Sequence, residues 1–310
     1  MGSFEGGLGR LELRGTAGLW QRTSRLKRWL YLGLVTERHY IGLAVVRLGY
    51  LASTFAFVLE RGKAGLVVDR AAFATPRSID FEDTMGEGAK VAIAARGAEV
   101  SFRRAASGSF QLEARFHGLR VSAELDPRVA PPAIGAVVPT ERGLFTTTEK
   151  RALLGLRGEA SVLGARVPLD GGLAGYDFTV GYPPRHTSWK WAFALGWVQG
   201  APLALNLVEG FVGSAECAAW FDGQLFGLSE GRFRFDLARP LDPWDVSTEA
   251  GEVALDFAPS GVHEERVNFG LMRTKFIQTA GLYGGSVTLG DRKLTIDSML
   301  GVSEDQDSFW

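Results

Sequence analysis

Side chains that could carry out acid/base chemistry are concentrated between residues 176 and 189. Asp177, Arg185 and His186 place a carboxylate, a guanidinium and an imidazole within ten residues, directly before a tryptophan-rich segment. The Pro183-Pro184 pair favours an extended corner, across which Asp177 and His186 can face each other. Because an imidazole titrates near neutrality, the segment predicts a general acid or base. The alternative is a structural ion-paired corner that closes a barrel.

Other side chains with catalytic potential stand alone in the sequence. Glu216 and Glu304, each beside an apolar segment, are further candidate acids, with solvated strand ends as the alternative. Cys217 lies among small apolar residues, which is more typical of a packed thiol than of a nucleophile. His263-Glu264-Glu265 has the His-x-Glu of zinc deaminases but lacks their Pro-Cys-x-x-Cys partner. With one cysteine, four scattered histidines and no phosphate-binding or dinucleotide-binding loop, the sequence predicts neither a metal site nor a cofactor.

Residues 187–197 alternate large apolar side chains with small or polar ones. A two-residue turn at Gln199-Gly200 would join this segment to the next in a hairpin whose opposed residue numbers sum to 399. Lys190 then lies opposite Glu209, and large side chains face small ones, which is how cross-strand pairs select a register. The odd-numbered positions form one face, named here the tryptophan face: Trp189, Trp191, Phe193, Leu195 and Trp197.

The same register places Asn206 opposite Phe193, on the tryptophan face. A buried amide costs a few kcal/mol unless its hydrogen bonds are satisfied. Either Asn206 ties down a neighbouring strand, or it is a polar group inside an aromatic pocket, the usual composition of a small-molecule site. On the second interpretation the ligand-binding residues are Trp189, Trp191, Phe193, Asn206 and Arg185.

The elements that must position these residues are short β-strands. Period-two alternation and glycine-containing turns recur along the whole chain, and helical periodicity is almost absent. The proline-rich segment 126–142 is interpreted as the connection between two β units, residues 1–135 and 136–310. Each unit has enough strands for a closed or nearly closed antiparallel barrel, which leaves no exposed sheet edges. Residues 267–279 are expected to form one strand.

Composition excludes several classes of protein. The formal net charge of −1 lacks the basic footprint that nucleic acid requires. No apolar run is long enough to span a bilayer as a helix, and the first residues lack the features of a signal peptide. The single cysteine rules out an intramolecular disulfide. These features together predict a cytoplasmic location.

Segments spread over most of the chain resemble an uncharacterised bacterial family, domain of unknown function 2804. At fold level the pattern is similar to tandem lipocalin-like proteins, including carotenoid hydratases and fungal cyclases, and Gly18-Leu19-Trp20 matches the lipocalin Gly-x-Trp. This resemblance implies an apolar barrel in which acids and aromatic rings act without a cofactor. It is carried by residues 150–158, 176–191, 205–207, 215–216, 220–223, 243–244, 268, 275–281, 300–304 and 310.

Three functions follow from these patterns. The first is the binding of an apolar or amphipathic small molecule in a barrel pocket on the tryptophan face. The second is a cofactor-independent hydratase, isomerase or cyclase, in which Asp177, Glu216 or His186 protonates an apolar substrate beside tryptophan rings. The third is a structural module, in which the tryptophan face is packed core. Neither the ligand nor the oligomeric state follows from the residues.

Overall fold

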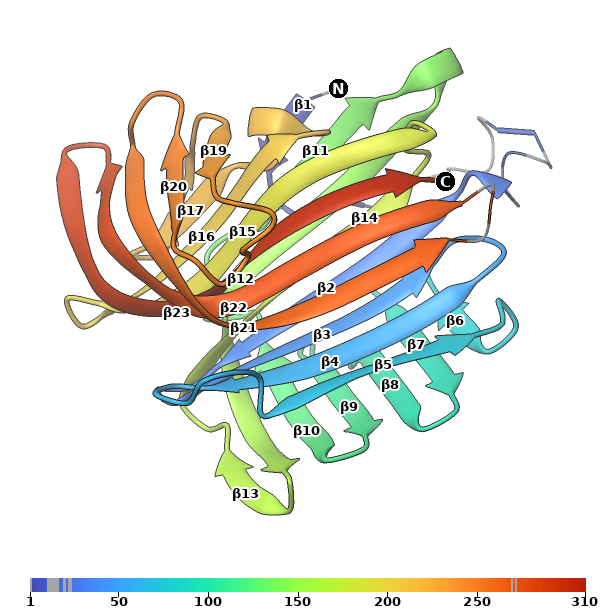
Figure 1. Cartoon of the computed structure of the whole chain (residues 1–310), viewed down its shortest axis with the longest axis horizontal. Helices are drawn as coiled ribbons and strands as arrows, with labels where there is room; N and C mark the ends of the chain where they lie inside the picture. Colours follow the sequence, from blue (N-terminus) through green and yellow to red (C-terminus); the bar gives the residue numbers. More distant parts are fainter. Residues whose placement is uncertain (1, 10–16, 19–20, 22–23, 269, 271) are drawn as a thin grey trace. The chain divides into compact units, whose positions relative to one another are not determined.

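Antiparallel strands are the main secondary structure of the protein in the computed structural model (Figure 1), which describes residues 2–9, 17–18, 21, 24–268, 270 and 272–310. Within these residues the strands form two sheets, joined by turns that include the 3-10 segments η2 (Glu141–Gly143) and η3 (Gly213–Glu216). The predicted all-β class, with barrel-like antiparallel units in tandem, is confirmed. The described residues contain no helix long and apolar enough to cross a membrane.

The first sheet contains the first fourteen strands of the described chain. Its main path runs β5-β4-β3-β2-β14-β12-β10-β9-β8-β7-β6, and β5 at one end contacts β7 near the other, which curls the sheet toward closure. The strands are β1 (Gly2–Glu5), β2 (Lys27–Val35), β3 (His39–Arg47), β4 (Ala52–Glu60), β5 (Val68–Ala74), β6 (Ile79–Phe81), β7 (Lys90–Ala95), β8 (Ala98–Arg104), β9 (Phe110–Phe116), β10 (Leu119–Asp126), β11 (Ile134–Pro139), β12 (Phe145–Val162), β13 (Ala165–Pro168) and β14 (Gly172–Gly181).

The second sheet contains the remaining nine strands of the described chain. Their order is β18-β17-β16-β15-β23-β22-β21-β20-β19, so most sequence neighbours are also spatial neighbours. The strands are β15 (His186–Val198), β16 (Ala201–Gly210), β17 (Ala218–Phe221), β18 (Gln224–Gly227), β19 (Gly231–Arg234), β20 (Trp244–Thr248), β21 (Val253–Asn268), β22 (Arg273–Leu289) and β23 (Arg292–Phe309).

The chain divides into two compact units whose boundary differs from the one expected at residue 135. Within the proline-rich segment, β11 pairs with β1 on one side and with β12 on the other, so the chain is still part of the first sheet there. The final passage into unit 2 comes after β14, at Pro184-Arg185. Unit 1 comprises Met1–Thr36, Ile41–Val58 and Val68–Pro184, and unit 2 comprises Glu37–Tyr40, Leu59–Val67 and Arg185–Trp310.

Residues 267–279, expected to form a single strand, instead contain a chain reversal. The strand β21 ends at Asn268 and β22 begins at Arg273, and the two pair antiparallel. The Asn268 side-chain oxygen accepts a hydrogen bond from the Gly270 backbone N–H at 3.0 Å. This is the turn geometry that asparagine favours, and it outweighs the apolar pattern around it. Of the Gly18-Leu19-Trp20 match, Leu19 and Trp20 lie outside the described residues.

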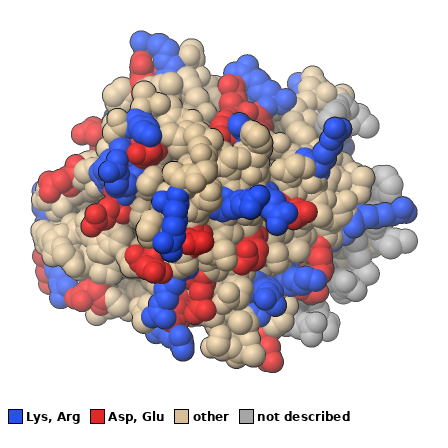
Figure 2. All heavy atoms as spheres, turned by 90° about the horizontal axis from the view of Figure 1, so that it is seen from below, with Lys and Arg blue, Asp and Glu red and all other residues tan. Residues whose placement is uncertain are grey.

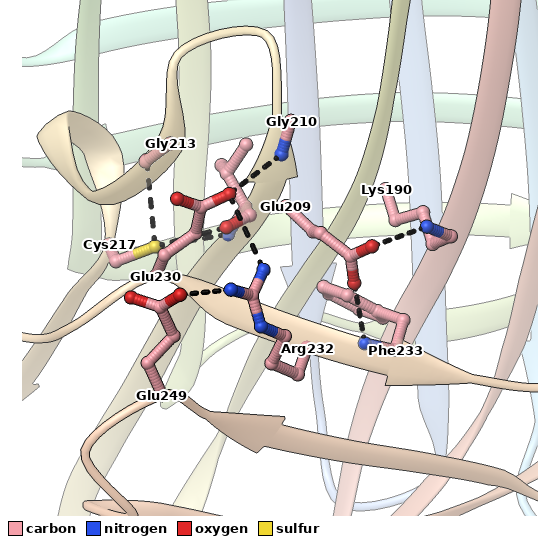
Figure 3. Close-up of polar contacts among 10 residues, drawn as sticks. Lys190, Glu209, Gly210, Gly213, Cys217, Glu230, Arg232, Phe233 and Glu249 are labelled. Carbon is pink, nitrogen blue, oxygen red and sulfur yellow. Dashed lines mark hydrogen bonds and ion pairs between the residues drawn. The ribbon is translucent and has the colours of Figure 1, made fainter.

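Side chains rather than a backbone ladder close the second sheet, between β16 and β19 (Figure 3). The Phe233 N–H donates to one carboxylate oxygen of Glu209 at 2.7 Å, and the Gly210 N–H donates to Glu230 at 3.1 Å. Arg232 forms ion pairs with Glu230 and with Glu249. Because β17 pairs only with residues Leu203–Asn206 of β16, these carboxylates join β19 to the part of β16 that lies beyond that ladder.

Candidate functional site

The hairpin formed by β15 and β16 has the predicted register. Lys190 lies opposite Glu209 and Trp191 opposite Val208, across a turn in which Gln199 and Gly200 both have positive φ angles, 54° and 82°. Two consecutive positive φ values are typical of the tight hairpin turn that glycine favours. The Lys190 Nζ atom lies 2.6 Å from Glu209 Oε1. The ion pair on which the predicted register is based is therefore present.

Side chains of the tryptophan face are buried at the centre of the strand and more exposed toward its ends. Trp191 and Phe193 stack with ring centroids 5.5 Å apart and are 4% and 0% exposed. Trp189 is half-buried and contacts Phe211, with ring centroids 6.5 Å apart. Trp197, at the other end of the strand, is 41% exposed. The predicted aromatic residues therefore share one face, and Trp197 lies outside its buried part.

Asn206 is fully buried on this face and connects two neighbours. Its Oδ1 atom accepts the Trp191 indole N–H at 2.8 Å, and its Nδ2 donates to the Glu216 backbone carbonyl at 2.8 Å. Burying an amide is tolerated when its hydrogen bonds are satisfied in this way. Asn206 thus fixes the orientation of the Trp191 ring.

A row of polar side chains crosses the tryptophan face at the level of Trp191. Directly opposed residues across three strand pairs are Trp191 and Glu304, Glu304 and Gln278, and Gln278 and His263. Opposed residues in antiparallel strands project from the same side of a sheet, so these four share one face. All are buried, with exposed fractions of 6% or less.

The carboxylate of Glu304 is the centre of this row. Its Oε1 atom accepts the Trp189 indole N–H at 2.8 Å and its Oε2 atom accepts the Gln278 side-chain amide at 2.7 Å. At the next level of β21, Glu265 Oε1 lies 3.5 Å from His263 Nε2. The row brings together a carboxylate, an amide and an imidazole beside tryptophan rings, which is the polar-in-apolar composition of a small-molecule site.

The sequence pattern singled out Glu304 and His263 separately but missed Gln278 and the row itself. The row joins residues on three strands, and its existence depends on the register of β21, β22 and β23. That register contains shifts between Pro259 and Gly261 and between Tyr283 and Gly285. Each shift changes which side of the strand a given residue occupies, so alternation alone does not place these side chains on one face.

Asp177 and His186, predicted to face each other, have different partners. Asp177 is buried on β14, with its Oδ2 atom 2.5 Å from the Lys150 Nζ atom of β12. The largely exposed His186 begins β15, and its Nε2 atom lies 3.0 Å from Asp307 of β23. The corner therefore contains two separate ion-pair geometries instead of one acid/base pair.

Arg185 and Glu216 both lie toward the open end of the β15–β16 hairpin, Arg185 directly before β15 and Glu216 in η3 after β16. The Arg185 guanidinium stacks over the Phe309 ring, 4.8 Å from its centroid, near the end of β23. The Glu216 side chain is 4% exposed, next to Cys217 in η3. Burial raises the pKa of the Cys217 thiol to about 11, and its Sγ atom contacts the Val208 backbone (Figure 3). A thiol in this state is a packed residue, not a nucleophile.

Unit 1 contains a second buried acid that the sequence analysis did not identify. Glu149, on β12, accepts the Tyr176 hydroxyl at 2.5 Å and the Leu8 backbone N–H at 2.6 Å. Burial raises the pKa of the Glu149 carboxyl, and these two hydrogen bonds oppose that effect only in part. The Tyr176 ring packs edge-on against Phe110 at 5.6 Å, so the acid lies in an aromatic interior.

A large hollow in unit 1 is lined mainly by residues of β6 to β10 and the turns between them, and Glu149 is not among its lining residues. It has a volume of about 1400 Å³ and is lined by small side chains interspersed with charged ones, among them Asp80, Glu113 and Arg115. In the view of Figure 2 basic and acidic side chains are mixed, and neither sign forms a large patch. Among the described residues no group of three or more His, Cys, Asp or Glu side chains is placed to hold a metal ion.

The sequence profile of one protein family matches residues 6–310, nearly the full length of the chain. Its description is "Domain of unknown function (DUF2804)". The protein belongs to this family. The resemblance found over most of the chain is thereby confirmed. No curated protein matches the chain.

Solved structures with the same fold include an AttH candidate from Nitrosomonas europaea, at 14% identity, a TM-score of 0.55 and 96% coverage of each chain. The structure of CghA is similar at 9% identity with a TM-score of 0.55, and the structure of CghA with Sch210972 is similar at 9% identity with a TM-score of 0.53. Each of these two matches covers 92% of this chain and 88% of the CghA chain. At these identities the likeness shows the fold alone, which is the predicted carotenoid hydratase-like, tandem lipocalin-like architecture.

Proposed function

We propose that the protein binds an apolar or amphipathic small molecule on the tryptophan face of unit 2. The observation that supports this most strongly is Glu304, a buried carboxylate held by Trp189 and Gln278 beside the stacked Trp191 and Phe193 rings. Rings of this kind supply apolar contact area, and the polar row supplies orientation. The similar structure of CghA with Sch210972 also supports small-molecule binding by this fold.

The amphipathic dye 1-anilinonaphthalene-8-sulfonate tests this function in the full chain. We expect saturable binding that quenches tryptophan fluorescence, and Trp189→Ala should weaken it about tenfold, the effect of losing one well-packed aromatic contact. Trp197→Ala is the matched control, because Trp197 lies on the same strand but outside the buried part of the face. The absence of saturable binding, or an equal loss in both variants, would contradict the proposal.

A second function, acid catalysis on an apolar substrate without a cofactor, is favoured by Glu149. A carboxyl with a raised pKa inside an aromatic interior retains its proton closer to neutral pH, which is the requirement for a general acid. The hydration, isomerisation or cyclisation of an alkene-like compound would begin with this proton transfer. Asp177, paired with Lys150, and the predicted His186 and Glu216 are the other groups to test.

Mass spectrometry of bound and released compounds separates binding from catalysis. The purified protein is incubated with a metabolite extract, and the compounds it retains are compared with those it releases. Recovery of an altered compound, lost in Glu149→Gln, supports the enzyme, whereas recovery of an unchanged compound supports binding alone. If no compound is retained or altered, the tryptophan face is packed core and the unit is a structural module.

A further inference from the structure

Two buried acceptor atoms on or next to the polar row have no hydrogen-bond partner among the described residues. They are the Oε1 atom of Gln278, in the row, and that of Glu265, at the next level of β21, where it is close to His263 without a hydrogen bond. The Gln278 side chain is only 1% exposed, so solvent at the surface does not reach its amide. An unsatisfied buried acceptor costs about 1–3 kcal/mol, and such groups are rare in folded proteins, so each requires an explanation such as strain, a catalytic role, or a bound water, ion or ligand.

The orientation of the Gln278 amide is fixed by its neighbours. Its Nε2 atom donates to Glu304 Oε2, and the other carboxylate oxygen of Glu304 already accepts the Trp189 indole, which can only donate. The amide nitrogen therefore faces Glu304 on β23, and the amide oxygen is the atom left without a partner. His263 is the residue opposite Gln278 on β21, and Glu265 follows at the next level.

We infer that this end of the tryptophan face binds a hydrogen-bond donor, the hydroxyl group of an amphipathic ligand, through Gln278 Oε1. The inference rests on the proposed function and adds the chemical class of the ligand: an apolar body with a hydroxyl group. The rings of Trp189 and Trp191 contact the apolar body, and the hydroxyl satisfies the acceptor that the protein leaves open. A ligand without a donor leaves Gln278 Oε1 unsatisfied, which is the basis of strong discrimination at polar sites.

Two fluorescent probes test the inference: 2-naphthol, which carries the donor, and its methyl ether 2-methoxynaphthalene, which replaces the hydroxyl hydrogen by a methyl group. Isothermal titration of the full chain should give about tenfold tighter binding of the alcohol, as expected when one buried acceptor is satisfied. In Gln278→Met, which keeps the side-chain length and removes the acceptor, the alcohol should lose this advantage. Gln306→Met is the control, because Gln306 lies on the same face, one level along β23, and donates to Ser308.

Each outcome has a distinct meaning. Equal affinity of the two probes for the wild-type protein overturns the hydroxyl inference and leaves the proposed function standing, and it is also the result expected if a water molecule occupies the acceptor. Failure of both probes to bind overturns the proposed function together with the inference. The wild-type comparison needs no variant, so it decides the question even if Gln278→Met fails to fold. A preference for the alcohol that persists in Gln278→Met also contradicts the inference.

Discussion

Asn206 illustrates how one buried side chain connects two parts of unit 2. It accepts from the Trp191 indole and donates to the Glu216 carbonyl. We expect Asn206→Ala to lower the free energy of unfolding by about 1–3 kcal/mol, because both hydrogen bonds are lost in a buried position. Trp191→Phe removes the indole N–H together with part of the buried ring, and because the bond to Asn206 is lost in either variant, the two changes combined should cost less than their sum. Urea unfolding of the double-mutant cycle measures this coupling, and strict additivity would contradict the direct bond.

The buried Lys27 should make the stability of the folded protein depend on pH. Its side chain is 1% exposed, and its Nζ atom donates to the carbonyls of Ser24 and Leu48. Burial, with a smaller contribution from the neighbouring Arg25, lowers the pKa of Lys27 from 10.5 to about 8. Between these two values the unfolded chain binds more protons than the folded one, so this residue makes stability rise with pH across that window.

In Lys27→Met this rise should be absent. The wild-type protein should gain stability relative to the variant by about 3 kcal/mol between pH 8 and pH 10.5, the equivalent of the shift in pKa. Thermal unfolding at a series of pH values measures the difference, with the exposed Lys293→Met as the control. Parallel pH profiles for wild type and Lys27→Met would show that the lysine titrates normally.

At the scale of elements, Glu209 belongs to two interfaces at once. One of its oxygens pairs with Lys190 across the hairpin, and the other accepts the Phe233 N–H of β19. Glu209→Ala should therefore destabilise the protein by roughly 1–3 kcal/mol and accelerate amide hydrogen exchange in β19. Lys190→Met removes only the hairpin pair and should leave β19 protected. Equal exchange in both variants would mean that Glu209 does not hold the closure.

Local sequence patterns predict most strands and the register of one hairpin, but not how the strands are arranged within the two sheets. The hairpin of β15 and β16 is predictable because Lys190, Glu209 and the glycine turn lie within 21 residues and select the same pairing. The row through Glu304, Gln278 and His263 is not, because bulges in β21 and β22 change the facing of residues. The chain reversal after Asn268 is not predictable from alternation either, because its turn-forming hydrogen bond is local geometry that alternation does not encode.

At the scale of the whole molecule, unit 2 includes a piece of chain that comes from early in the sequence. The Gly65 N–H donates to the Ser260 carbonyl at 2.6 Å, and Leu66 packs against Gly261 of β21. A Cβ atom at position 261 would lie 2.7 Å from the Leu66 side chain and 2.8 Å from its backbone nitrogen. Glycine at this position therefore permits the close approach of the two segments.

We expect Gly261→Ala to lower the free energy of unfolding by about 1–3 kcal/mol, because the backbone around Leu66 would have to move. Gly284→Ala is the matched control, since its Cβ would meet nothing closer than 3.6 Å in β22. Denaturant midpoints of the two variants provide the comparison. Similar midpoints would mean that the early segment does not pack closely on β21.

This arrangement has a consequence for the way the protein acquires its structure during synthesis. Segments Glu37–Tyr40 and Leu59–Val67 leave the ribosome long before β21, β22 and β23, yet they belong to the same compact unit as those strands. Contacts that join residues so far apart in the chain are slow to form, because a long loop must close before they are made. The early segments therefore lack their packing partners, and their apolar side chains are not buried in unit 2, until β21, β22 and β23 have been translated. Unit 2 is thus completed only once β21, β22 and β23 have been synthesised, and until then the apolar side chains of the early segments favour aggregation.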